Sequence, residues 1–150
     1  MSTGAWVLVV AVVGAIAFGL YRATTDGRFR GTHQVHGATE PAAEQPAVQS
    51  VLEGTPWADQ LGERATLLQF SSAFCAPCRA TRRILHDVAE TTPGVVHLEV
   101  DAEHHLDLVR RLGILRTPTT LVLGAQGHEL TRATGAPTKQ QVQAALQLIK

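Results

Sequence analysis

An unbroken apolar run near its start constrains this chain of 150 residues more than any other feature. The run comprises eighteen residues, from Gly4 to Tyr21, and contains no charged side chain. As a helix it would reach about 27 Å, close to the roughly 30 Å hydrocarbon core of a bilayer. Trp6 and Tyr21 lie near its two ends, where aromatic residues favour the membrane interface. We therefore predict a transmembrane helix at residues 4–21 that anchors the chain in a lipid bilayer.

Two other interpretations of the run remain open. A cleaved signal peptide usually has basic residues before its apolar region and a small-x-small cleavage site after it, and the sequence has neither. A buried core helix would need a polar face, which the run lacks. Because Arg22, Arg28 and Arg30 follow the run and no Lys or Arg precedes it, we expect a single-pass protein of the cell membrane with its C-terminal part in the cytoplasm.

Residues 22–50 are predicted to form a flexible linker. Glycines and prolines interrupt any periodic pattern there, and the apolar content is too low to form a core. His33 and His36 have a spacing that could hold a metal, but no further ligands lie nearby, so we interpret them as solvated. The whole chain has 13 basic and 13 acidic residues, which gives no positive surplus to indicate a nucleic-acid partner.

From residue 51 to residue 150 the pattern predicts one α/β domain. Short β-branched runs alternate with segments of helical spacing, and glycines or prolines separate them. The expected order is strand, helix, strand, helix, strand, strand, helix, at 65–72, 76–90, 95–100, 104–112, 119–123, 128–134 and from 138 onward. Strand-helix-strand units imply parallel pairing and the last two strands imply a hairpin, so we predict a mixed central sheet flanked by helices on both faces.

The two cysteines of the chain, Cys75 and Cys78, form a Cys-x-x-Cys motif at the predicted start of a helix. Unpaired backbone N–H groups and the helix dipole stabilise a thiolate at that position. We expect Cys75 to be the exposed attacking thiol and Cys78 the more buried resolving thiol, with Pro77 suited to the first helical turn. A zinc site would need two more ligands, for which only His104 and His105 could be proposed, and we interpret those as surface residues.

Several motifs in the same order show that residues 51–150 resemble a thioredoxin domain: LLQF, FCAPCR, HLEVDAE, LGILRTPTTLVL, the turn at Gly127, and Thr134-Gly135-Ala136. The resemblance implies that Thr117 and Pro118 form a cis-proline pair beside the disulfide. It also implies that the Thr117 backbone pairs with substrate and that Gly135 lies on the same docking surface. Phe74, Ala76 and Pro77 would complete that surface around the cysteines.

The sequence departs from the family at five positions near the motif. Phe74 stands where the family usually has Trp, Ala76 where it has Gly, and Arg83 where it has a helix-kinking proline. Gln69 replaces a buried Asp that is thought to help deprotonate the second cysteine, and His97 replaces the Lys that accompanies it. Because Gln69 cannot accept a proton, the acid-base assistance is either lost or moved to His97, whose ordinary pKa is near neutral. His97 is therefore a candidate proton relay, and a hydrogen-bonded strand histidine without a catalytic role is the other interpretation.

The sequence as a whole predicts a membrane-tethered thiol–disulfide oxidoreductase that reduces protein disulfides through Cys75 and Cys78. Its cofactor would be the redox-active disulfide alone, and its electron donor would be a protein such as a thioredoxin reductase. Two alternatives stay open. One is an extracytoplasmic reductase that serves a single client pathway, such as cytochrome maturation, and the other is a non-enzymatic binding module that uses the thioredoxin fold.

Overall fold

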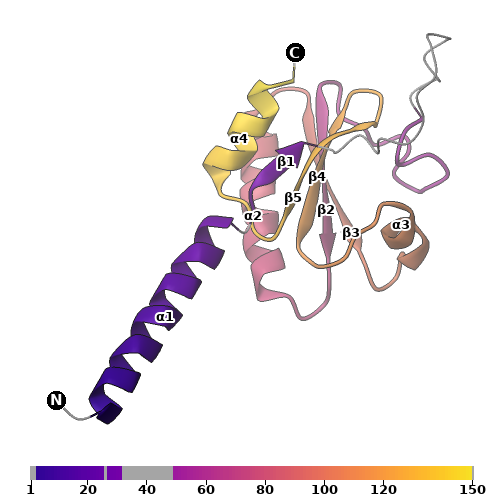
Figure 1. Cartoon of the computed structure of the whole chain (residues 1–150). Coiled ribbons are helices and arrows are strands. Elements are labelled where there is room, and N and C mark those ends of the chain that lie inside the picture. Colours follow the sequence, from indigo (N-terminus) through magenta and orange to yellow (C-terminus); the bar gives the residue numbers. More distant parts are fainter. Residues whose placement is uncertain (1–2, 26, 32–48, 150) are drawn as a thin grey trace, which may run out of the picture.

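The computed structural model describes residues 3–25, 27–31 and 49–149. Its helices and strands are α1 Thr3–Thr25, β1 Phe29–Gly31, β2 Ala65–Ser71, α2 Ala76–Thr91, β3 Val95–Asp101, α3 Leu106–Arg111, β4 Thr119–Gly124, β5 Glu129–Thr134 and α4 Lys139–Gln147. Figure 1 shows α1 as a rod that projects from a domain formed by all the other elements. The order of elements from β2 to α4 is the predicted one, and each boundary lies within about two residues of its prediction.

A mixed sheet of five strands forms the middle of the domain, in the order β1-β5-β4-β2-β3. β2 runs parallel to β3 and antiparallel to β4, and the two outer pairs, β4 with β5 and β5 with β1, are antiparallel. All seven residues of β2 are buried. The predicted α/β architecture, with a mixed central sheet and flanking helices, is therefore confirmed.

The side chains of β2 alternate between two cores, one on each face of the sheet. Leu68 and Phe70 belong to the core under α3, which also contains Leu108 of that helix. Leu67 belongs to the core on the other face, where α2 and α4 contribute Leu85, Val88, Val142, Ala145 and Leu146. Because alternate residues of a strand share a face, Gln69 and Ser71 lie on the face that α2 covers.

The linker predicted at residues 22–50 differs from the structure in its described part. α1 continues four residues beyond the predicted end of the anchor, to Thr25. Phe29–Gly31 then forms β1, which pairs with β5, and Phe29 packs against the core beneath α4. The backbone edge of β5 and the packing of Phe29 thus hold a three-residue strand in a segment whose glycines predicted a linker. His33 and His36 lie outside the described residues.

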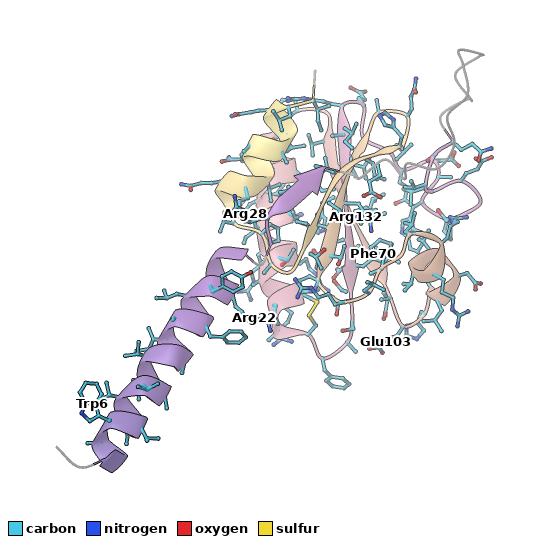
Figure 2. The ribbon with its side chains drawn as sticks, in the orientation of Figure 1. Trp6, Arg22, Arg28, Phe70, Glu103 and Arg132 are labelled. Atoms are coloured by element: carbon cyan, nitrogen blue, oxygen red, sulfur yellow. A yellow bond between two sulfur atoms is a disulfide. The ribbon has the colours of Figure 1, made fainter. Side chains whose placement is uncertain are left out.

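Among the described residues, Gly4–Arg22 is the one stretch long and apolar enough to cross a membrane, with a mean hydropathy of 2.2. None of that stretch is buried inside the protein, which separates it from a core helix. Its length and composition fit both a membrane span and a signal sequence. Figure 2 shows Trp6 toward the far end of this helix and Arg22 near the domain, the arrangement expected of an interfacial aromatic residue and an interfacial cation.

Candidate active site

The two cysteines form a disulfide at the N-terminus of α2, with an S–S distance of 2.00 Å. Cys75 is the N-cap residue, and its Sγ and carbonyl oxygen each accept a hydrogen bond from the Cys78 N–H at 3.1 Å. Cys75 is half-buried, whereas Cys78 is 2% exposed. Of the two cysteines, Cys75 is therefore the more accessible from solution. Figure 2 shows the disulfide as a yellow bond.

Exposed side chains surround the disulfide. Phe74, directly before Cys75, is 100% exposed, and Ala76 and Pro77 are exposed as well. Leu115, on the loop that leads into β4, is 95% exposed. Large apolar side chains with this degree of exposure form no part of the cores, so they are available to a partner molecule.

The Thr117–Pro118 peptide bond is cis, as the resemblance implied. Its position is fixed from two sides. The Thr117 hydroxyl lies 3.1 Å from the Ser72 hydroxyl, which ties it to the loop before the cysteines. On the other side, the Pro118 carbonyl accepts a hydrogen bond from the Gly135 N–H at 2.8 Å. These contacts bring Thr117, Pro118 and Gly135 to the same end of the sheet as the disulfide.

A buried polar network underlies Cys78. The Gln69 amide, fully buried, donates to the Cys78 carbonyl at 3.0 Å and to the Ser71 hydroxyl at 2.7 Å. Ser71 in turn donates to Glu99 Oε1 at 2.6 Å. Gln69 Oε1 is buried and has no hydrogen-bond partner among the described residues. Gln69 thus connects α2 to the sheet below it, and the carboxylate of the network is Glu99 rather than a residue on β2.

Arg82 of α2 completes this network from the other side. Its guanidinium binds Glu99 through two contacts, Nη2 to Oε1 at 2.7 Å and Nε to Oε2 at 2.6 Å. Burial alone would raise the pKa of Glu99, but hydrogen bonds from Arg82 and Ser71 and the charge of Arg82 hold it below its ordinary value. Glu99 is therefore an anion at neutral pH.

An open cleft of about 350 Å³ joins the disulfide to this carboxylate. It is lined by Ser71, Ser72, Ala73, Cys75, Cys78, Arg79, Arg82, Glu99 and Asp101. Sequence analysis missed Glu99 as a member of the site. Glu99 could have been predicted from its position two residues after His97. That spacing places both side chains on the same face of the sheet as Gln69.

His97, the candidate proton relay, does not line this cleft. It pairs in register with Leu67, while Glu99 pairs with Gln69, one step nearer to the cysteines. Its Nε2 is buried without a hydrogen-bond partner in the described ranges. Burial, followed by the positive charges of His86 and Arg82, lowers the pKa of His97 to about 4 against the opposing effect of Glu99. Because it lies outside the cleft, His97 is poorly placed to take a proton from Cys78.

The two adjacent histidines after β3 have different partners. His104 Nδ1 lies 2.9 Å from Asp101 Oδ2, and His105 stacks edge-on against Trp57 with ring centroids 4.7 Å apart. Within the part of the chain that the structure describes, no group of three or more metal-ligating side chains comes together.

Comparison with known proteins gives a consistent result. A family model described as Thioredoxin matches residues 48–148. Thioredoxin domain-containing protein 2 of Homo sapiens is 38% identical over 60 residues, or 40% of this chain, and the match spans only 11% of that protein's length. Thioredoxin of Pongo abelii is 25% identical over 88 residues, covering 59% of this chain and 82% of the relative. The solved structure of Fasciola hepatica thioredoxin superposes with a TM-score of 0.54 at 21% identity, covering 61% of this chain and 86% of the other.

Proposed function

Because the chain belongs to the thioredoxin family, we propose that it is a membrane-tethered thiol–disulfide oxidoreductase that reduces protein disulfides through Cys75 and Cys78. The observation that carries this proposal is the half-buried Cys75 at the N-terminus of α2, disulfide-bonded to a buried Cys78 and close to the cis Thr117–Pro118 bond. A dithiol at a helix N-terminus favours the nucleophilic thiolate.

The reaction proceeds in two exchanges. In the reduced protein, the Cys75 thiolate attacks one sulfur of a substrate disulfide, forms a mixed disulfide and releases the first substrate thiolate. The Cys78 thiolate then attacks the Cys75 sulfur and releases the second substrate thiolate. The substrate gains two electrons and two protons, and the protein is left with its Cys75–Cys78 disulfide. A dithiol electron donor, such as a thioredoxin reductase, returns it to the reduced state.

Substrate binding falls to the loops around the disulfide. Thr117 is next to the cis-proline at the edge of the cleft, and its backbone would pair with an extended substrate segment, with Gly135 on the same surface. Phe74, Ala76 and Pro77 are exposed beside Cys75 and would contact the residues that flank the substrate cysteine.

Glu99 is our candidate for the group that accepts the proton of Cys78 through water in the cleft. Both residues line the cleft, and Gln69, which takes the place of the family's carboxylate, is already committed to Cys78 and Ser71 as a donor. If this is right, Glu99→Gln should slow the Cys78 exchange and shift its pH profile. Asp101→Asn, which alters a cleft carboxylate bound to His104 and the Glu103 N–H, should leave that profile in place. An unchanged pH profile in Glu99→Gln would exclude Glu99, and a shifted profile in His97→Ala would assign the role to His97.

We place the catalytic domain on the cytoplasmic side of the cell membrane, because the arginines follow the span. Labelling His36→Cys in intact cells with a membrane-impermeant maleimide tests this assignment. Protection from the reagent supports it. Strong labelling would support the client-specific extracytoplasmic reductase instead.

The activity itself is tested with purified, reduced protein and insulin as a model disulfide substrate. We expect the native protein to reduce insulin and Cys75→Ser to lose at least about 10³-fold of that activity, because the attacking thiolate is gone. Cys78→Ser should accumulate a mixed disulfide on Cys75. Equal reduction of insulin by the native and Cys75→Ser proteins would remove Cys75 from the mechanism, and a native protein that reduces no insulin would support the binding module.

A further inference from the structure

The helix of the anchor is joined to the catalytic domain by a very short connection. α1 ends at Thr25, and the backbone N–H of Gly27 already donates to the carbonyl of Thr134, the last residue of β5, at 2.9 Å. A flexible linker of the length predicted from sequence would instead separate the two by about 30 Å on average. The domain therefore has little freedom to move away from its anchor.

Gly27 is closely packed where it meets the domain. Its φ is +75°, and a Cβ added there would lie 2.1 Å from the Ala136 carbonyl oxygen and 2.8 Å from the Pro137 nitrogen. No other residue fits this position without moving the loop that follows β5. The next residues then form β1, with Phe29 opposite Ala133. The connection is thus part of the fold.

The loop that holds Gly27 also borders the active site. Gly135, between Thr134 and Ala136, donates to the Pro118 carbonyl at 2.8 Å, and Thr117 is in turn bound to Ser72. Two backbone hydrogen bonds therefore connect the exit of the anchor to the cis-proline. Figure 1 shows α1 leaving the domain at the end of the sheet where β5 ends and β4 begins, which is the end that contains the cysteines.

Exposed apolar side chains occupy the same end. Phe74 is on the loop between β2 and α2, next to Cys75, and Leu115 is on the loop that enters β4, two residues before Thr117. They are 100% and 95% exposed. Apolar side chains at this end can pack against apolar groups of a partner, and a partner at the bilayer surface offers such groups.

We propose that the active site is held facing the bilayer surface and that its substrates are disulfides in membrane-bound proteins, placed close to the point where the substrate chain leaves the membrane. This inference rests on the proposed membrane tether and thiol–disulfide chemistry. The short connection confines Cys75 to a thin layer above the membrane, so disulfides in that layer meet it at a high effective concentration and distant ones do not. The chemistry is the two-step exchange already described.

Full-length protein in liposomes, reduced and in excess over substrate, provides the test. The substrates are two synthetic peptides, and each has one apolar span and the same disulfide loop. The loop lies about 3 residues from the span in the near peptide and about 25 residues from it in the far peptide. Insulin serves as the soluble substrate. We expect the near loop to be reduced at least about tenfold faster than the far loop. A near-to-far ratio of about one, with insulin still reduced, would overturn the inference alone. Failure to reduce any of the three would overturn the proposed chemistry as well.

Variants of the connection between α1 and β1 test whether its short length causes the preference for the near loop. Inserting about twenty Gly and Ser residues after Thr25 should lower the near-to-far ratio to about two-fold or less without changing the insulin rate. Gly27→Val should act in the same direction, because it displaces the connection from Ala136. The matched control is Gly54→Val, which imposes a similar φ of +73° where a Cβ meets nothing within 4 Å. A ratio that survives the insertion would contradict the proposal.

Discussion

α1 and β2 are both strongly apolar, yet they have opposite surroundings. Every residue of β2 is buried, and its side chains pack between α3 on one face and α2 with α4 on the other. The large apolar side chains of α1, in contrast, are 44% to 66% exposed. Transfer of apolar surface out of water is favourable. For β2 the protein itself removes the apolar side chains from water, whereas nothing in the described domain covers the apolar side chains of α1.

The largest expected effect is on the stability of the domain, through the buried strand β2. Leu67→Asp puts a carboxylate into the core between β2 and α2 and should destabilise the domain by more than about 4 kcal/mol. Denaturant unfolding followed by circular dichroism measures this. Leu8→Asp in α1 is the matched control, and the midpoint of domain unfolding should not change in it. Equal destabilisation by both variants would contradict the comparison.

The second effect is on the exposed side. Val12→Arg places a charge near the middle of the apolar run and should cost membrane insertion about 2.5–3.5 kcal/mol. Fractionation of cells should therefore move a large part of the protein out of the membrane pellet, while the thermal midpoint of the domain stays the same. Full retention of the variant in the membrane after carbonate extraction would argue against a spanning helix.

The third expected effect is a pH dependence of the domain's unfolding free energy that arises from His97. His97 pairs in register with Leu67, and its pKa is lowered in the folded state to about 4. The unfolded chain therefore binds a proton at higher pH than the folded chain does. The stabilisation from a neutral His97 is present above about pH 6.5 and is lost as the pH falls toward 4, by about 1–2 kcal/mol once partial exposure is allowed for.

Urea unfolding at several pH values between about 4 and 7 tests this dependence. His97→Gln should flatten it. Membrane attachment should not change over the same range, because residues 4–20 carry no ionisable side chain. A slope that is the same in the native protein and in His97→Gln would assign the effect to other groups.

Local patterns predicted most of this fold. Alternation, helical spacing and turn residues located the strands and helices from β2 to α4, and the spacing of Cys75 and Cys78 located the disulfide, because each depends on residues close together in the chain. α3 is shorter than expected: it begins at Leu106 after His105 as the N-cap residue, and His104 instead contacts Asp101. A resemblance to a known family was needed for the cis-proline, since nothing local distinguishes a cis from a trans bond.

Two features depended on pairings that a local pattern does not contain. β1 has three residues, and its partner β5 follows about a hundred residues later, so the segment resembled a linker. Glu99 joins the site only through the parallel register of β2 with β3 and through Arg82 on α2. The sequence pointed to His97 instead, because that position corresponds to the family's lysine. β1 connects the domain to α1, and Glu99 connects the cleft to Arg82, so both features depend on contacts between segments that are distant in the sequence.

The most direct test of the account is to trap its covalent intermediate in native membranes. Full-length Cys78→Ser retains the attacking thiol and lacks the resolving one, so mixed disulfides with natural substrates should accumulate. We predict adducts that dithiothreitol releases, that map to Cys75, and that are absent from the Cys75→Ser/Cys78→Ser double variant. Finding no adducts, or finding the same adducts in the double variant, would contradict the claim that this chain exchanges disulfides through Cys75.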